Sequence, residues 1–403
     1  MSMSAVEWKK LGDVANYYRG VTYNKKQEVE LNTGGTKILR ANNISLETNR
    51  LNFDDIKEIS QDVSIKDYQW LDVDDILICA GSGSKEHVGK VAFIEDKIGY
   101  AYGGFMGKIV VIAGLLPRYL YHIISGSLFK NYLDVSLNST TINNLNSEIV
   151  NNFLIPIPSL AKQQEIVSHL DTFTTLISNL ESELDMRRKQ YEHYRNQLLD
   201  FEGVEGVEWK KLGEVGLFYG GLSGKSKEDF QDGNAKFVTY MNIYSNSSLD
   251  TTIVDMVKVG ENEKQNSINY GDILFTGSSE TPDDCGMSCV VTNHVDEPIY
   301  LNSFCFGFRF NEVEKFEPSF FKHYFRCTAM RKAIAMTASG VTRFNVSKKR
   351  LAKVQMPILS INEQREIGKL LDTFTTLISN LEQEIKLRNQ HSEYYREKLL
   401  TFE

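Results

Sequence analysis

The sequence predicts an α+β protein: two mixed α/β domains in tandem, separated by two long antiparallel helices that form a coiled coil with pseudo-twofold symmetry. The first observation is an internal duplication, because the twelve residues LDTFTTLISNLE occur at positions 170–181 and again at 371–382. The segment VEWKKLG repeats with the same offset of 201 positions, starting at Val6 and at Val207. A period of about 200 residues exceeds that of solenoid repeats, so each repeat is a whole domain followed by a whole helix.

The second observation is the pattern of the repeated helix. Apolar residues alternate at spacings of three and four, which is typical of a coiled-coil seam. A helix of about 42 residues spans roughly 63 Å and cannot fold back inside one domain, so we expect it to pair with its own repeat. The seam residues are Leu170, Phe173, Ile177, Leu180 and Leu184 in the first copy, and Leu371, Phe374, Ile378, Leu381 and Ile385 in the second.

Proline and glycine mark the domain limits. Each helix follows a proline signal, IPIPSLAKQQEI or MPILSINEQREI, and begins at a capping serine, Ser159 or Ser360. Gly203 and Gly206 end the first helix and leave a short link, so the second helix must return antiparallel to the first. These signals predict a first domain at 1–158, its helix at 159–202, a second domain at 203–359 and its helix at 360–403.

Each domain is expected to hold many short strands followed by helical segments. The strand candidates are apolar runs bounded by Gly, Asn and Asp. They are residues 36–44, 74–82, 90–96 and 108–114, with counterparts at 236–244, 271–279, 289–294 and 306–311; the helical stretches are 117–133 and 318–334.

Composition narrows the class of protein. No apolar run has the length of a membrane span, and the five cysteines follow no paired framework, so we expect a reduced, cytoplasmic protein without membrane contact. Although the net charge is −8, one segment has an excess of positive charge. No acidic residue lies between Glu317 and Glu363, where there are nine basic residues. Such a run is either a nucleic-acid footprint or an ordinary solvated face.

Three patterns resemble enzyme or metal sites and fall short of them. GGLSGKS at 220–226 lacks the first glycine of a phosphate-binding loop. Glu95-Asp96-Lys97, following Asp74 and Asp75, loosely resembles a nuclease metal triad of the Asp…Glu-x-Lys kind but has no counterpart in the second repeat. Cys285, Cys289 and His294 lack a fourth ligand and standard zinc spacing. We therefore expect no catalytic residue and no metal in this chain.

Polar residues recur at three loop positions in both repeats. Arg and Lys suit guanine, Asn suits adenine, and Ser and Thr suit phosphate, although any single one can be ordinary turn chemistry. The candidate DNA-binding residues are Arg40, Asn42, Asn43, Ser82, Ser84, Lys85, Thr140, Thr141 and Asn143 in the first domain, and Tyr240, Asn242, Ser278, Ser279, Thr342, Arg343, Asn345, Lys348 and Lys349 in the second.

With these elements in order, the chain resembles the specificity (S) subunit of type I DNA restriction-modification systems. The resemblance covers essentially the whole chain. It rests on the EWKKLG segments, the Asp-Ile-Leu strands followed by Gly/Ser loops, the two proline boundaries and the repeated helices. The chain departs from the usual pattern at Leu359, where a second proline is expected, and lacks the usual Gly-Thr-Pro near each domain start.

The resemblance implies a function. Family members hold two target-recognition domains, each reading half of a bipartite DNA site, while the helices set the gap and dock two methyltransferase (M) subunits. Restriction (R) subunits complete the complex, and S-adenosylmethionine, ATP and magnesium are expected in the partner subunits, with none bound by this chain. Because the loops differ between the repeats, we expect an asymmetric site on double-stranded DNA. The alternatives are a coiled-coil scaffold that binds only protein and a catalytic fused polypeptide.

Overall fold

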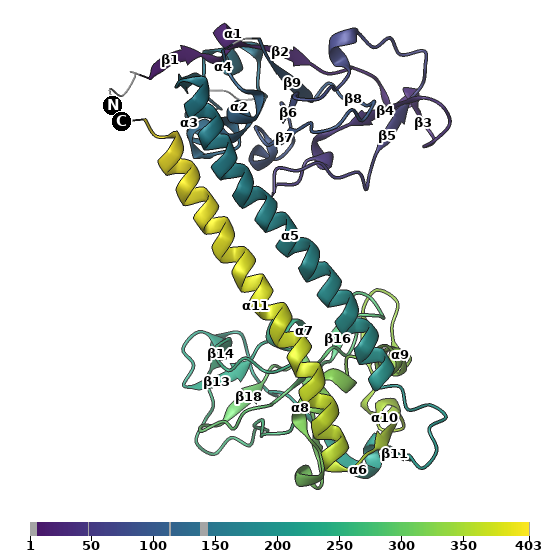
Figure 1. Ribbon diagram of the computed structural model, residues 1–403. Coiled ribbons are helices and arrows are strands. Elements are labelled where there is room, and N and C mark those ends of the chain that lie inside the picture. Colours follow the sequence, from purple (N-terminus) through teal and green to yellow (C-terminus); the bar gives the residue numbers. More distant parts are fainter. Residues whose placement is uncertain (1–5, 47, 113, 138–143, 403) are drawn as a thin grey trace. The chain divides into compact units, whose positions relative to one another are not determined.

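The computed structural model describes residues 6–46, 48–112, 114–137 and 144–402 (Figure 1). The chain divides into two compact units: unit 1 is Met1–Leu180 with Glu384–Glu403, and unit 2 is Glu181–Gln383. The long helices α5 (Leu160–Leu198) and α11 (Ile361–Leu400) contribute residues to both units. Among the described residues, no helix has the length and apolar character needed to cross a lipid bilayer.

Unit 1 is built on two sheets. The first has the order β2-β9-β6-β7, the second β3-β5-β4-β8, and β1 pairs separately with β10. Its strands are β1 (Glu7–Lys10), β2 (Ala15–Arg19), β3 (Glu28–Val29), β4 (Thr36–Leu39), β5 (Lys57–Ile59), β6 (Ile76–Cys79), β7 (Val91–Phe93), β8 (Ala101–Tyr102), β9 (Met106–Val111) and β10 (Leu154–Ile157). Its helices before α5 are α1 (Leu11–Val14), α2 (Pro117–Ile124), α3 (Ser127–Leu137) and α4 (Ser147–Asn152), with 3-10 turns at Lys25–Gln27, Ala41–Asn43, Asp67–Gln69 and Lys85–His87.

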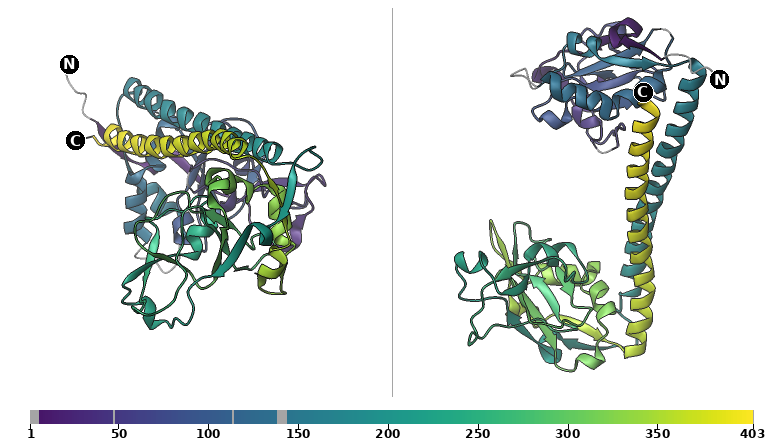
Figure 2. Two further views of the ribbon diagram at one scale, coloured as in Figure 1. Left: turned by 90° about the horizontal axis from the view of Figure 1, so that it is seen from below. Right: turned by 90° about the vertical axis from the view of Figure 1, so that its left-hand side faces the viewer.

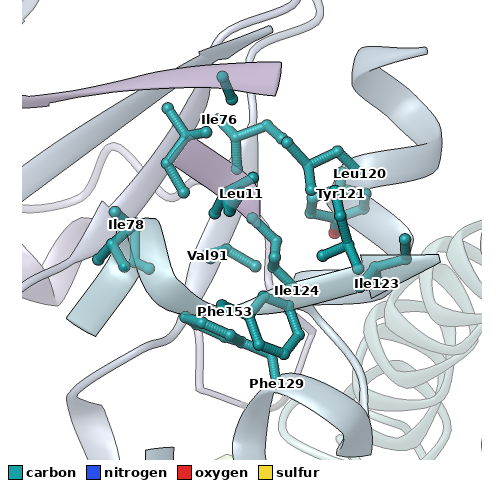
Figure 3. Close-up of a cluster of buried hydrophobic side chains, with 14 of the residues drawn as sticks. Leu11, Ile76, Ile78, Val91, Leu120, Tyr121, Ile123, Ile124, Phe129 and Phe153 are labelled. Carbon is teal, nitrogen blue, oxygen red and sulfur yellow. The ribbon is translucent and has the colours of Figure 1, made fainter. Parts of the chain in front are cut away.

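Strand β6 shows why the sequence Ile-Leu-Ile-Cys is apolar throughout. Ile76 and Ile78 belong to the core between the first sheet and the helices, whereas Leu77 and Cys79 belong to a second core on the opposite face. A strand covered on both faces cannot alternate with polar residues. Figure 3 shows the first core, where Ile76, Ile78 and Val91 meet side chains of α2 and the edge-on rings of Phe129 and Phe153, whose centroids lie 4.8 Å apart.

Unit 2 repeats this plan with additions. Its sheets have the orders β12-β19-β15-β17, β14-β13-β18 and β16-β21-β20, and β11 pairs with β22. The strands are β11 (Glu208–Lys211), β12 (Gly216–Gly220), β13 (Ala235–Val238), β14 (Val254–Val257), β15 (Ile273–Thr276), β16 (Ser278–Ser279), β17 (Ser288–Val290), β18 (Ile299–Leu301), β19 (Cys305–Phe310), β20 (Ala338–Ser339), β21 (Phe344–Val346) and β22 (Gln355–Ile358). The helices are α6 (Leu212–Val215), α7 (Tyr240–Ser245), α8 (Pro318–Tyr324), α9 (Thr328–Ala335) and α10 (Lys348–Leu351), with 3-10 turns at Glu228–Phe230 and Val313–Lys315.

Within each unit the long helices pair through the same contact. In each unit a stretch of α5 lies beside a stretch of α11 (Figure 2). Phe173 stacks on Tyr395 in unit 1 and Tyr194 on Phe374 in unit 2, both with ring centroids 5.4 Å apart. Phe374 and Tyr395 lie 201 positions after Phe173 and Tyr194, so the two stacks are one contact with the helices exchanged. Within each unit the two helices therefore run antiparallel, as the sequence predicted.

The apolar seam is the least exposed side of these helices. Leu170, Ile177, Leu371 and Leu381 are buried, and the remaining seam residues are half-buried, namely Phe173, Leu180, Leu184, Phe374, Ile378 and Ile385. An ion pair between Arg188 and Glu382, with its atoms 2.6 Å apart, bridges the helices beside the seam.

One buried glutamine fastens each domain to its long helix, and we call Gln163 and Gln364 the clamp glutamines. The side chain of Gln163 accepts the Leu116 amide at 2.8 Å and donates to the carbonyls of Pro158 and Gly114. Gln364 repeats the pattern, accepting the Glu317 amide at 2.8 Å and donating to the carbonyls of Lys315 and Leu359 at 3.0 Å. Each glutamine thus satisfies three backbone groups, two in the segment leading into α2 or α8 and one at its own helix start.

A histidine–aspartate pair makes the second attachment. His122 Nε2 lies 2.8 Å from Asp171, and His323 Nε2 lies 2.7 Å from Asp372, again 201 positions on. Burial lowers the pKa of both histidines in spite of the adjacent carboxylates, so each ring is neutral near pH 7 and donates from Nε2. In unit 2 the other nitrogen, Nδ1, is 2.8 Å from the hydroxyl of Tyr191.

Two groups of predicted elements were wrong in detail. The strand predicted at 236–244 ends at Val238, because the Thr239 hydroxyl accepts the Asn242 amide and starts α7. The strand predicted at 36–44 ends at Leu39 and turns into the 3-10 segment Ala41–Asn43, where the Asn43 side chain accepts the Arg40 amide. The helical stretches 117–133 and 318–334 are each two helices. The first break lies at Gly126, where an added Cβ would meet the Arg396 side chain of α11 at 2.8 Å.

Candidate nucleic-acid interface

Two of the three polar loops predicted in unit 1 border one open groove of about 1450 Å³. Arg40 and Asn42 lie on one wall, after β4, and Ser82 lies on another, after β6. Asn144 lines the groove directly after the third loop and is bridged to Gly81. The predicted residues Thr140, Thr141 and Asn143 of that third loop lie outside the described residues.

One carboxylate holds the first wall in place. Asp55 accepts from Arg40 Nη2 and from Asn42 Nδ2, each at 2.7 Å. The Arg40 side chain lines the groove and stays 30% exposed, while the contact with Asp55 fixes its position. Two fixed donors side by side, one from a guanidinium and one from an amide, suit the acceptor-rich edges of bases.

The prediction that Asn43 contacts DNA was wrong. Asn43 is fully buried, and its amide donates to the carbonyls of Asn52 and Asp55 while its oxygen accepts the Arg40 amide. Asn43 therefore shapes the loop that presents Arg40 and Asn42.

The second wall carries smaller groups. Ser82 is half-buried at the groove, and Ser84 and Lys85 are exposed beyond it, where Lys85 lies 4.0 Å from Asp134. Lys90 also lines the groove, with its Nζ donating to the Ile44 carbonyl at 2.6 Å, and burial lowers its pKa. Asn144 accepts from Arg19 at 3.2 Å, which ties the third loop to β2.

Unit 2 brings its three predicted loops together as well. The Tyr240 hydroxyl donates to the Ser278 carbonyl at 2.8 Å, and Arg343 Nε donates to the Ser278 hydroxyl at 3.2 Å. Ser278 also pairs with Asn345 between β16 and β21, and Ser279 pairs with Phe344. We call Tyr240, Ser278, Phe304, Arg343 and Asn345 the Arg343 cluster.

Asn242 repeats the correction made for Asn43. It is 1% exposed and donates to the carbonyls of Asp250 and Ile253 at 2.7 and 2.6 Å, so its side chain braces this loop from inside the domain. Thr342 and Lys349 are exposed, and Lys348 Nζ lies 5.8 Å from the centroid of the Phe306 ring.

The basic run of unit 2 has two parts with different roles. Arg326 is wrapped by the carbonyls of Ser288, Ile243, Tyr244 and Asn246, and Arg331 by those of Asp283, Cys285 and Gly286. Both guanidiniums are thus engaged by backbone carbonyls of unit 2. The exposed members of the run are Lys332, Arg343, Lys348, Lys349, Arg350 and Lys353.

The enzyme-like patterns have structural roles in this fold. Asp75, beside the suspected metal triad, forms a buried ion pair with Lys108 at 3.0 Å, matched in unit 2 by Asp272 and Arg309 at 2.6 Å. Cys285 and Cys289 are buried thiols, and His294 stacks on Tyr270. Within the described ranges, no group of three or more His, Cys, Asp or Glu could hold a metal ion.

Sequence reasoning missed two exposed aromatic side chains. Phe105 lines the unit 1 groove and is 72% exposed, and Phe304, at the matching place before β19, is 60% exposed beneath Arg343, whose Cζ is 5.7 Å from the ring centroid. A phenylalanine between two apolar strands is normally predicted to be a core residue, so its exposure becomes evident only from its position at the edge of the sheet.

The sequence of the chain is similar to that of a known protein family. A family profile described as "Type I restriction modification DNA specificity domain" matches residues 3–186 and again 204–387. The chain belongs to this family. The two matched segments each contain one of the loop sets described above.

Several known proteins are similar over long stretches. The chain is 32% identical to the EcoR124I/EcoR124II specificity subunit of Escherichia coli over 62% of its own length and 63% of the relative, and 25% identical to the EcoKI specificity subunit of E. coli over 68% and 62%. The matches thus span less than two thirds of these relatives. A candidate type I specificity subunit of Haemophilus influenzae is 26% identical over 99% of this chain and 96% of its own.

Solved structures share the fold. An S subunit of the type I restriction-modification system from M. genitalium superposes with a TM-score of 0.54 at 14% identity, covering 100% of this chain and 98% of that one. A chain from a study of complex assembly in the type I R-M system gives 0.59 at 16% identity, covering 98% and 96%.

Proposed function

We propose that this chain is the DNA-recognition subunit of a type I restriction-modification complex. Residues 1–158 and 203–359 are the two target-recognition domains, and 159–202 and 360–403 are the spacer helices that set the gap and dock two M subunits. The observation that carries the proposal is that both units gather loops from the same places in the fold while presenting different side chains. Equivalent frames with unlike contact groups suit an asymmetric, bipartite DNA site.

The chemistry of each loop set supports base reading. Arg40 and Asn42 offer donors and an amide oxygen to base edges, and Arg343 with Asn345 offers a second, differently shaped set in unit 2. Ser82, Ser84, Lys85, Ser279, Thr342, Lys348 and Lys349 are of the types that contact phosphate and fix the register.

Catalysis belongs to the partners in this proposal. M subunits supply S-adenosylmethionine-dependent methylation, and R subunits use ATP and magnesium. The chain itself positions them on DNA, in the cytoplasm, where its thiols remain reduced.

The test is a selection on a randomised duplex library with the full chain bound to its M subunits. We expect a bipartite motif with two unlike halves, bound more weakly as salt rises. Arg40→Ala should relax one half and Arg343→Ala the other, whereas Arg365→Ala, an exposed arginine of α11 paired with Glu317, should leave the motif unchanged. A palindrome, one continuous block, or no DNA binding would contradict the proposal, and the last result would favour the protein-only scaffold.

The role of the helices has its own test. Deleting one heptad from both α5 and α11 should shorten the gap while both half-sites stay the same. A change in either half-site would contradict the spacer role.

A further inference from the structure

The exposed rings of Phe105 and Phe304 occupy equivalent positions at the recognition loops. Phe105 lies between β8 and β9, and Phe304 between β18 and β19. The Phe105 carbonyl accepts the amides of Ala80 and Gly81, both at 2.9 Å, and the Phe304 carbonyl accepts the Gly277 amide at 2.8 Å. Both rings are therefore held by their backbone to the loop that follows the central strand β6 or β15.

The backbone leaves little freedom at these points. A Cβ at Gly277 would meet the Phe304 carbonyl oxygen at 2.5 Å, and one at Gly81 would meet the Phe105 ring at 3.3 Å. The aromatic residue is thus set tightly against the glycine of the recognition loop while its ring remains 72% or 60% exposed.

A phenyl ring that is mostly exposed among polar side chains can gain stability by contact with an apolar group of a ligand. Phe105 shares its groove with Arg40, Asn42, Ser82 and Asn144, and Phe304 lies under Arg343. Burial of a phenyl ring is favourable by about 1.5–3 kcal/mol, and a phenylalanine side chain, unlike that of tyrosine or tryptophan, has no polar atom to direct toward a base edge. The occupant of the groove must therefore bring an apolar group to this point.

Duplex DNA offers few such groups. Base faces are hidden in the stack, and the major groove presents hydrogen-bonding atoms together with one hydrocarbon group, the C5-methyl of thymine. We propose that Phe105 and Phe304 each read a thymine methyl, one in each half-site, beside the polar contacts of Arg40 with Asn42 and of Arg343. This inference rests on the proposed function and adds to it two specificity-determining residues and an A·T pair in each half of the site.

The experiment uses the full chain with its M subunits and the duplex motif recovered by selection. Each thymine is replaced in turn by deoxyuridine, which removes the methyl and keeps every base-edge hydrogen-bonding atom. We expect one position in each half-site to lose affinity by about fourfold, as expected for one methyl group removed from a contact. Phe105→Ala should abolish the effect in one half-site and leave it in the other, and Phe304→Ala should do the reverse.

Controls separate the possible failures. Ile112→Ala removes another exposed apolar side chain of unit 1, 57% exposed, and should leave both deoxyuridine effects in place. Thermal melting should be unchanged in both phenylalanine variants, since each ring is mostly exposed. If the wild-type complex binds no specific DNA, the proposed function fails.

Three results would overturn the inference while the proposed function stands. The first is a half-site that contains no A·T pair. The second is a deoxyuridine effect that persists at full size in Phe105→Ala. The third is a phenylalanine variant that binds the motif more weakly although deoxyuridine has no effect on binding by the wild-type complex. The last result would point to a ring inserted between base steps, which acts through DNA bending instead.

Discussion

The clamp glutamine Gln364 offers a stringent test of how a domain is attached to its helix. In Gln364→Glu the side-chain shape is kept, but the nitrogen that donates to the carbonyls of Lys315 and Leu359 becomes an oxygen. Gln364 is 2% exposed, so water cannot replace the lost donors. Each stranded carbonyl costs about 1–3 kcal/mol, and the two together about 2–6 kcal/mol.

Differential scanning calorimetry measures this loss. For a unit of this size, 1 kcal/mol corresponds to about 2–4 °C in Tm, so we expect the transition of unit 2 to fall by at least about 4 °C at pH 7.5. Burial favours the protonated carboxyl, which can donate one hydrogen bond. The difference from wild type should therefore shrink as the pH is lowered toward about 5.

Matched changes make the result decisive. Asn362→Asp makes the same amide-to-acid change two positions earlier, at an exposed site in the first turn, and should cost nothing or stabilise slightly. In unit 1, Gln163→Glu should lower Tm and its exposed neighbour Gln164→Glu should not. If Gln364→Glu melts like Asn362→Asp, the clamp does not hold the domain.

Three further outcomes follow from the same contacts. Tyr191→Phe leaves His323 Nδ1 without its donor and should cost about 1–2 kcal/mol in urea denaturation, while Ser392→Ala, at the equivalent position, should cost less. Burial lowers the pKa of His122 and His323 below the ordinary 6.5, so as the pH falls the unfolded chain is protonated at these residues before the folded chain is. We therefore expect Tm to be constant above about pH 6.5 and to fall below it. A Tm that is flat down to about pH 5.5 would contradict this. Asn242→Ala should destabilise unit 2 by about 2 kcal/mol yet leave the base preference of the folded complex intact, whereas a changed motif would mean that Asn242 touches DNA.

The helices were predictable because their information is local. A three-four alternation of apolar residues specifies one helix face whatever surrounds it, and the exact repeat of 170–181 supplied the partner. The strands of the central sheets were predictable for a similar reason, since Ile76 to Cys79 and Ile273 to Thr276 are β-rich runs bounded by Asp and Gly.

The candidate site was less predictable because it depends on distant groups. Asn43 and Asn42 are neighbours of the same type, yet one is buried under carbonyls 9 and 12 residues ahead and the other faces the groove. Arg326 and Arg343 look alike in a basic run, but only the fold shows that four carbonyls surround the first. Phe105 was overlooked because hydrophobicity in sequence gives no sign of exposure.

The attachments at Gln163 with Asp171 and at Gln364 with Asp372 have a consequence for how such chains diversify. The polar bonds from each domain end on the same positions of its helix. In each repeat the glutamine bonds two backbone groups of the domain and one at its own helix start, and these bonds do not depend on the domain's side chains. The attachment positions on the helix are therefore the same in both repeats. The surface loops of a domain can differ completely, as they do between the two units, without any compensating change in the helix that holds the domain.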